Sequence, residues 1–306
     1  MKWRSLVMLL IFGCVFSMAR ISLAMNSLNY QVNWDSLNSG GDDISSSTNY
    51  QVHDTVGEQA TGDSSSALYG IQAGYRTGDA DFSAETFSIG TAEEATKIAY
   101  SVFSTSTDSV VVSSAASFSV GNKIAVVENS GLNEMVSVGR VMNITGTTLT
   151  VDQWNGATST MSGIAAGGDD FVYRLEGSSA QLGTVSVGGA STAVTATNVA
   201  STAPNGYTVS VMDDGNLRTG SDSMTNVSDG AVSLGSEEYG AQVQGQHAVG
   251  TGTDFALSPT STRIIQANTT TAVTDRVALI YKLAIKSSTA AGDYSQVVYY
   301  LLTANY

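Results

Sequence analysis

In residues 276–286, RVALIYKLAIK, a large apolar residue stands at every second position. In an extended chain this alternation places five apolar side chains on one face: Val277, Leu279, Tyr281, Leu283 and Ile285. Lys282 and Lys286 fall on the opposite face, which is the pattern of a half-buried antiparallel strand. Similar short alternations recur along the chain, whereas long stripes with the helical period are scarce, so the sequence predicts an all-β fold.

The composition supports a folded β protein. The chain has 306 residues, is rich in Ser, Thr, Gly, Ala and Val, and contains two prolines, Pro204 and Pro259. β-branched residues separated by Gly, Asn, Asp and Ser are typical of short strands joined by tight turns. A Ser/Gly-rich disordered chain is the alternative, but 42% hydrophobic residues and 13 tyrosines provide enough apolar surface for a core.

Residues 1–24 have the three parts of an export signal. Lys2 and Arg4 form a basic start, and residues 5–18 are apolar but too short to span a bilayer. Ser22-Leu23-Ala24 then offers small residues to a signal peptidase. We therefore expect a protein secreted from a bacterium or held at its surface, beginning near Met25 and without stable membrane insertion. A retained N-terminal anchor is the alternative.

Charge and cysteine content narrow the classes of partner. Removal of the signal takes away the single cysteine, Cys14, and three of the 13 basic residues, leaving ten against 27 acidic ones, a net charge of −17. Nucleic acid and anionic membranes repel such a chain, so the sequence excludes nucleic-acid binding. Neither a disulfide framework nor a thiol nucleophile is then available. Lipidation of Cys14 is the alternative to cleavage, although Phe12 is bulky where a lipoprotein box has a small residue.

Residues 25–83 contain a short repeat. The sequence Asn29–Val32, NYQV, returns as Asn49–Val52, and the frame Ser-x-x-Tyr recurs at Ser66–Tyr69. Tyr and Val share one face of each NYQV copy, so the repeats predict β-strands in either a short meander or a solenoid-like stack. The segment has few large aliphatic residues, and we expect it to pack against the rest of its own chain or against a neighbour.

Residues 84–176 are predicted to form a small β-barrel-like unit. Turn signals separate four strand candidates, residues 109–113, 123–127, 135–138 and 148–151. Residues 91–103 are the one candidate helix, since Thr91 and Glu94 have capping-box spacing. The phrase FSVGNKIAVVE…MVSVGRVMNITGTTLTVDQW is similar to small β-barrel modules of bacterial and phage extracellular proteins.

Residues 177–306 contain enough alternating strand candidates for an immunoglobulin-like β-sandwich without the cysteine pair. The segments STAPNGYTVSV, EEYGAQV and AGDYSQVVYYLLTANY resemble the C-terminal domain of secreted bacterial surface proteins of the pilin, adhesin and spore-coat-like kind. The resemblance implies structural roles for the residues of two turns: Asn205, Gly206, Tyr207, Gly292, Asp293 and Tyr294.

The sequence shows no catalytic motif. The two histidines, His53 and His247, stand outside any metal or catalytic frame and are interpreted as surface strand residues. Nucleophile elbows, Walker loops and dinucleotide fingerprints are absent, although a triad assembled from distant residues stays open. Exposed aromatics such as Trp34 and Trp154 could bind sugars, but packing is the commoner role of an isolated tryptophan.

Acidic pairs, mostly beside glycine, are the metal candidates. Asp79, Asp81, Asp169 and Asp170 could supply oxygen ligands to extracellular calcium. Asp beside Gly is also ordinary turn chemistry, and the sequence contains no complete calcium-loop motif. We therefore expect no cofactor, with calcium as the open alternative.

The last strand candidate, residues 295–306, is apolar on both faces. Six residues alternate between the two faces of this assembly strand: Val297, Val298, Tyr299, Tyr300, Leu301 and Leu302. A strand of this kind belongs in a sheet covered on both sides. We expect part of Asn26 to Tyr75 to pair with the C-terminal sandwich, within one chain or between chains. An autonomous N-terminal β meander joined by a flexible link is the alternative.

Together these features predict an exported, non-catalytic structural subunit of a pilus-, fibre- or coat-like assembly. Its expected partner is itself, by strand pairing or head-to-tail assembly. No C-terminal anchor motif follows Leu302, so we expect release, retention by other proteins or polymerisation. A secreted module that binds carbohydrate or a host, with surface glycans as partners, is the alternative, and a secreted hydrolase is the third reading.

Overall fold

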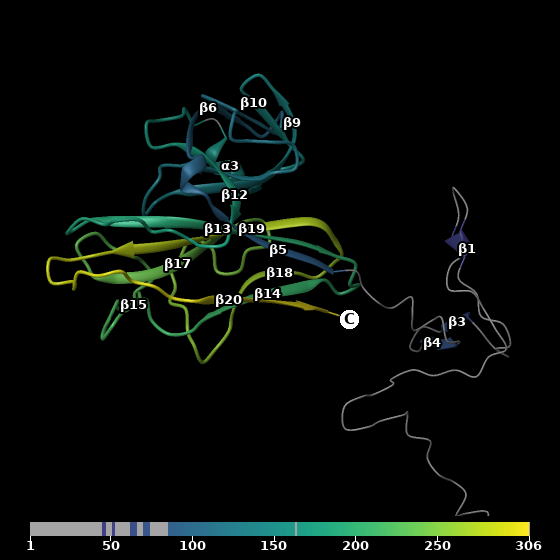
Figure 1. Cartoon of the computed structure of the whole chain (residues 1–306). Helices are drawn as coiled ribbons and strands as arrows, with labels where there is room; N and C mark the ends of the chain where they lie inside the picture. The colour runs from purple at the N-terminus through teal and green to yellow at the C-terminus, as the bar shows by residue number, and fades with distance from the viewer. Residues whose placement is uncertain are drawn as a thin grey trace, which may run out of the picture. The chain divides into compact units, whose positions relative to one another are not determined.

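The structure, a computed structural model, describes residues 85–162 and 164–305, and upstream of them four short strands (Figure 1). The chain divides into two compact units, residues 1–82 and 83–306. In the first unit two antiparallel pairs are described: β1 (Ser45–Ser46) with β2 (Gln51–Val52), and β3 (Gly62–Ser65) with β4 (Gly70–Ala73). The second repeat copy contributes to β2, whereas the first and third copies, like the signal segment, lie outside the described residues.

Strands dominate the described structure. It is 50% strand and 3% helix with antiparallel sheets, which confirms the all-β prediction. In the part of the chain that the structure describes, no helix combines the length and the apolar character needed to cross a membrane.

The helix predicted over residues 91–103 is wrong. Strand β5 (Glu85–Ala92), a 3₁₀ turn η1 (Glu94–Thr96) and strand β6 (Ile98–Ser104) occupy this region. The Thr91 hydroxyl donates to the Ser179 carbonyl at 3.2 Å instead of capping a helix. Both flanks pair with other strands, and this tertiary pairing outweighs a weak local helix signal.

Six strands of the second unit close into a barrel. Pairing runs from β6 through β7 (Ser109–Val112), β10 (Thr148–Val151), β9 (Met135–Thr145), β8 (Lys123–Glu128) and β12 (Phe171–Gly177), and returns to β6. Strands β7 to β10 overlap the four predicted strands, and β9 extends well beyond the predicted residues 135–138. The inward side chains form one core, which includes Phe103, Ile124, Leu149, Trp154 and Val172. Short β11 (Asn155–Gly156) and α3 (Thr158–Met161) follow β10, and α3 adds Met161 to that core.

Two packed sheets make up the rest of the second unit (Figure 1). One has the order β5, β13 (Ala190–Ser201), β19 (Ala272–Ala284), β17 (Glu238–Gln244), and the other has the order β18 (Arg263–Asn268), β14 (Tyr207–Asp213), β20 (Val298–Ala304). A small hairpin, β15 (Arg218–Thr219) with β16 (Asp222–Ser223), follows β14. The core between the sheets includes Tyr207, Val209, Ile265, Leu279 and Tyr281. Strand β5 pairs with β13 along its length and with β12 at its end, so it joins this sandwich to the barrel.

The barrel covers the outer face of the β13–β19 sheet. Outward side chains of β8, β9 and β12 pack on Val194, Ala196, Ala278 and Ile280 in a separate cluster. Strand β19 is therefore buried on both faces, and the prediction of a half-buried strand is wrong. Lys282, expected on a solvent-facing side, is 3% exposed and paired with Asp254.

An ion pair between the buried Arg276 and the partly exposed Asp152 fastens the barrel to the same strand. Arg276 on β19 is 2% exposed, and its guanidinium donates to both Asp152 carboxylate oxygens, at 2.9 and 2.5 Å. It also donates to Asn198 Oδ1 at 2.9 Å. Asp152 directly follows β10, so the guanidinium bridges barrel and sandwich.

The last strand differs from its prediction. Val298, Tyr300 and Leu302 of β20 pack on the sandwich core, as expected for one face. Side chains on the other face, including Tyr299 and Leu301, are exposed in the described structure. The described residues therefore cover the inner face of β20 but not its outer face. The reason is topological, because the barrel packs on the β13–β19 sheet, whereas β20 belongs to the other sheet.

Candidate functional site

An apolar surface is exposed on the outer side of the β18–β14–β20 sheet. Val297, Tyr299 and Leu301 are 50%, 53% and 56% exposed. The strand register places Leu301 and Ile264 on either side of Ser210, and Tyr299 beside Met212. We define the outer apolar face as Val297, Tyr299, Leu301, Ile264 and Met212. Contiguous exposed apolar surface of this kind marks an interaction site more often than an isolated apolar residue does.

The two edges of this sheet differ. At the β18 edge, Ala248 forms an antiparallel bridge with Gln266, and the Val249 N–H donates to the Ile265 carbonyl at 2.9 Å. Strand β20 forms the other edge and, among the described strands, pairs with β14 alone. Natural edge strands are usually protected by charged residues or proline, and residues 295–306 contain neither.

Strand β20 is firmly held on its inner face and at its start. The hydroxyls of Tyr300 and Tyr281, from opposite sheets, lie 2.7 Å apart, and burial raises the pKa of Tyr300 to about 12. Asp214 and Val297 exchange two hydrogen bonds of 3.0 Å, one from each backbone N–H. Arg218 in turn donates two hydrogen bonds to the Asp214 carboxylate. A partner would therefore meet a preorganised strand, which lowers the entropy cost of binding.

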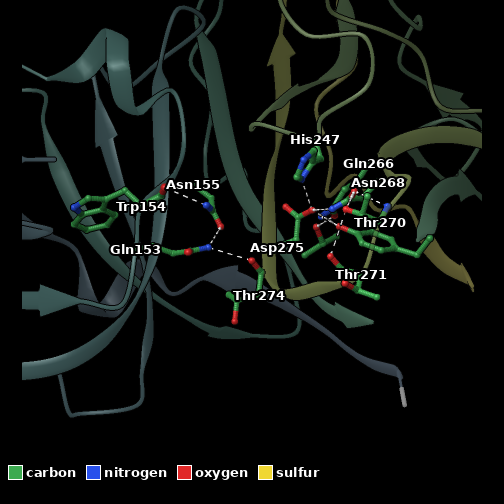
Figure 2. Close-up of polar contacts among 12 residues, drawn as sticks. Gln153, Trp154, Asn155, His247, Gln266, Asn268, Thr270, Thr271, Thr274 and Asp275 are labelled. Atoms are coloured by element: carbon green, nitrogen blue, oxygen red, sulfur yellow. Dashed lines mark hydrogen bonds and ion pairs between the residues drawn. The ribbon is translucent and has the colours of Figure 1, made fainter. Parts of the chain in front are cut away.

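A buried carboxylate organises a second cluster (Figure 2). Asp275 on β19 accepts a hydrogen bond of 2.5 Å from the Tyr207 hydroxyl, and its carboxylate lies 2.5 Å from His247 Nδ1. Gln266 Nε2 donates to the Tyr207 hydroxyl at 2.7 Å, and Thr197 donates to Gln266 at 2.6 Å. Burial, reinforced by the contact with Asp275, raises the pKa of Tyr207 well above its ordinary value. One chain of hydrogen bonds thus connects four strands and the β17–β18 loop, and it ends at the Asp275 carboxylate.

This cluster contains a histidine–carboxylate pair, an arrangement that also occurs in catalytic triads. A histidine oriented by a buried carboxylate acts as a general base when a nucleophile lies at its other ring nitrogen. The Thr197 and Thr270 hydroxyls are already hydrogen-bonded to Gln266 and Asn268. The contacts of the cluster suit a structural clamp between strands.

Sequence reasoning missed this clamp. His247, interpreted as a surface strand residue, lies in the turn after β17, and its side chain is 33% exposed. Its partner Asp275 is 28 residues away, and no local pattern connects the two. His53 lies outside the described residues.

The two predicted turns have close structural contacts. The Gly206 N–H donates to the Ala203 carbonyl at 3.0 Å, and its φ of +75° is one that glycine adopts readily. A Cβ at Gly206 would lie 2.0 Å from the Asn268 carbonyl oxygen, and one at Gly292 would lie 2.8 Å from the Thr219 hydroxyl. Tyr207, next in the chain, opens β14 and is fully buried. In the second turn, the Tyr294 hydroxyl donates to the Ala290 carbonyl at 2.9 Å, whereas Asp293 is exposed.

The calcium candidates are only partly described. Asp79 and Asp81 lie outside the described residues. Asp170 is buried and accepts hydrogen bonds from the backbone N–H groups of Asn129 and Gly167, whereas Asp169 is exposed. Within residues 85–162 and 164–305, no group of three or more His, Cys, Asp or Glu side chains is arranged to hold a metal ion. The observed role of Asp170 is therefore that of a turn residue.

Trp154 packs in the barrel core. Its ring lies 5.0 Å from that of Phe103 between centroids, and its Nε1–H donates to the Ser104 carbonyl at 3.2 Å. It is therefore not a sugar-binding platform, while Trp34 lies outside the described residues. Beside it, Gln153 Nε2 donates to the Thr274 carbonyl at 3.1 Å, a further link from barrel to sandwich (Figure 2).

Comparison with known proteins gives no match to a family model, a curated protein or a solved structure.

Proposed function

We propose that this protein is an exported, non-catalytic structural subunit of an extracellular or cell-surface assembly, with β20 as its assembly strand. The observation that carries the proposal is an uncharged, proline-free edge strand whose outer side chains are half exposed and apolar. A strand edge of this kind favours the addition of another strand, which gains backbone hydrogen bonds and buries apolar surface.

The added strand, in this proposal, comes from the same protein. The chain without its signal carries a large negative charge, so a strand from another copy adds nothing to the repulsion only if it is uncharged. Residues 28–34, LNYQVNW, meet that requirement and alternate Tyr30, Val32 and Trp34 on one face. Part of Asn26 to Tyr75 pairs with β20, either within one chain or from the next copy, and the second arrangement gives a head-to-tail fibre.

The sandwich architecture, the export signal and the resemblance to surface proteins also support a structural role outside the cell. Two packed antiparallel sheets are what an immunoglobulin-like sandwich requires, and we assign that architecture to residues 177–306 together with β5. The export signal supports secretion, and the resemblance to pilin, adhesin and spore-coat-like proteins supports a pilus-, fibre- or coat-like assembly.

A secreted adhesin module is the second candidate. Tyr299 favours it, because an exposed aromatic ring beside apolar neighbours offers a stacking surface to a glycan or a host protein. The same surface would then bind a foreign ligand instead of a second copy.

Charged substitutions on β20 test the proposal. We expect sedimentation velocity of the chain from Met25 to Tyr306 to show concentration-dependent oligomers, and Leu301→Lys and Tyr299→Lys to leave monomers. Val273→Lys is the matched control, since Val273 is 92% exposed on the opposite sheet, and it should associate as the wild type does. Equal association of all four proteins would show that β20 is not the assembly surface. A strictly monomeric wild type that binds a glycan array would favour the adhesin.

A further inference from the structure

Two basic residues lie opposite each other on the β8–β9 pair of the barrel. Lys123 and Arg140 are register partners on these antiparallel strands, so their side chains share one face of the sheet. Lys123 is partly buried, whereas Arg140 is exposed. Like charges directly opposite each other on neighbouring strands destabilise a sheet. In a chain with 27 acidic and 13 basic residues, two facing cations call for a physical reason.

The donors of both side chains are largely unused within the described part of the chain. Lys123 Nζ donates to the Ser88 hydroxyl on β5 at 2.6 Å, which leaves N–H groups for a further acceptor. The Arg140 guanidinium has no hydrogen bond or ion pair with another described residue. Its Nη2 lies beside the turn at Gly121, 3.9 Å from the position of a Cβ there.

The carboxylates in this region are paired with other cations. Asp152 is bound by Arg276, and Glu176 lies 3.3 Å from an arginine of its own strand. Burial and the charges of Arg276 and Arg140 lower the pKa of Lys123. Glu176 acts in the opposite direction without offsetting them. Two positive charges, on Lys123 and Arg140, are thus left without a paired anion among the described residues.

We propose that Lys123 and Arg140 together bind a phosphate group. An ammonium is a compact point charge and a guanidinium is a planar fork of N–H donors, and both are common ligands of phosphate in proteins. A dianionic phosphate matches the two unpaired charges, so the bound anion replaces their mutual repulsion by attraction to a shared partner. The Ser88 hydroxyl, which accepts from Lys123, retains its own O–H as a third donor at this site.

The acidic character of the whole chain restricts the size of the ligand. A net charge of −17 without the signal repels a long polyanion. A small anion at the site is exposed mainly to the nearby cations, because charges more than about 10 Å away are largely screened at about 0.1 M salt. We therefore expect inorganic phosphate or a small phosphate ester. The inference is independent of the assembly proposal, because the site lies in the barrel and β20 belongs to the sheet that the barrel does not cover.

Isothermal titration calorimetry of the chain from Met25 to Tyr306, in phosphate-free buffer at constant ionic strength, tests the proposal. We expect saturable binding of inorganic phosphate that weakens about tenfold or more in Lys123→Met and in Arg140→Gln, because each loses a charge-assisted hydrogen bond. Lys123→Arg keeps the charge and should still bind. Lys286→Met, at an exposed lysine of the sandwich, is the matched control and should bind as the wild type does.

A parallel titration with glycerol phosphate separates the two sources of the group. Tighter binding of the ester would identify a phosphorylated small molecule as the ligand, and equal or weaker binding would identify the free ion. Both results support a phosphate site.

Thermal denaturation gives a readout that a merely structural role of the two residues would not produce. Without phosphate, Lys123→Met and Arg140→Gln should keep or raise the wild-type Tm, since each removes one of two facing charges. Added phosphate should raise the Tm of the wild type and of Lys286→Met, and of neither site variant.

Three results would overturn the proposal. The first is a wild-type protein that shows no saturable binding at millimolar phosphate, which requires no variant to fold. The second is phosphate binding that is as tight in Lys123→Met and Arg140→Gln as in the wild type. The third is binding of acetate as tight as that of phosphate, which would show that the site does not select a phosphate group.

Discussion

Replacing Asp152 by asparagine would leave the Arg276 guanidinium charged and buried without its anionic partner. Breaking a buried pair from one side costs about 3–5 kcal/mol. Asp152 is 25% exposed at its side chain, so water reaches this site, and we take the lower end, about 3 kcal/mol. For a unit of this size each kcal/mol lowers the Tm by about 2–4 °C, so the expected loss is about 6–12 °C.

The same pair predicts a pH dependence. Burial acts to raise the pKa of Asp152, but the hydrogen bonds from Arg276 and from the backbone of Arg140 and Gln153 outweigh it and lower the pKa below 3.8. A carboxyl whose folded pKa is depressed stabilises the fold above the unfolded pKa, and that contribution is lost as the pH falls through the folded pKa. The free energy lost in Asp152→Asn, measured by urea denaturation, should therefore shrink below pH 3.8.

Asp293→Asn is the control for this experiment, because Asp293 is exposed. It should change the free energy of unfolding by no more than about 0.5 kcal/mol. If Asp152→Asn is no more destabilising than Asp293→Asn at neutral pH, the Arg276 pair does not fasten the barrel to the sandwich.

Three further predictions concern the sandwich. Asp275→Asn should cost about 3 kcal/mol in urea denaturation, because a carboxylate hydrogen-bonded to Tyr207 and paired with His247 is lost; a cost like that of Asp293→Asn would rule out the clamp. Gly206→Ala should lower the Tm sharply, since the new Cβ would meet the Asn268 carbonyl at 2.0 Å, and an unchanged Tm would contradict the turn geometry. In spectrophotometric titration, Tyr300→Phe should remove a tyrosine that ionises near pH 12, and an identical titration curve would show that Tyr300 is not buried against Tyr281.

Local alternation predicted the strands well, because a period of two depends only on neighbours in the chain. Strands β7 to β10 lie where four short alternating or apolar runs predicted them. Alternation along one strand does not show whether an element far away in the sequence covers its second face. The second face of β19, with Ala278 and Ile280 between Arg276 and Lys282, is itself half apolar, and that signal would have predicted two-sided burial.

The buried clusters were harder to predict for the same reason. Arg276 and Asp152 are 124 residues apart, and Tyr207 and Asp275 are 68 apart, so only the folded topology brings them together. The assembly strand stood out in the sequence through its apolar residues. Which of its faces stays exposed depends on sheet order, which strand patterns do not encode.

Negative-stain electron microscopy of the protein from Met25 to Tyr306 tests whether β20 mediates assembly. We expect fibres or ordered arrays that disappear in Leu301→Lys and persist in Val273→Lys. Isolated particles of monomer size at every concentration, for the wild type as for both variants, would contradict an assembly role for β20.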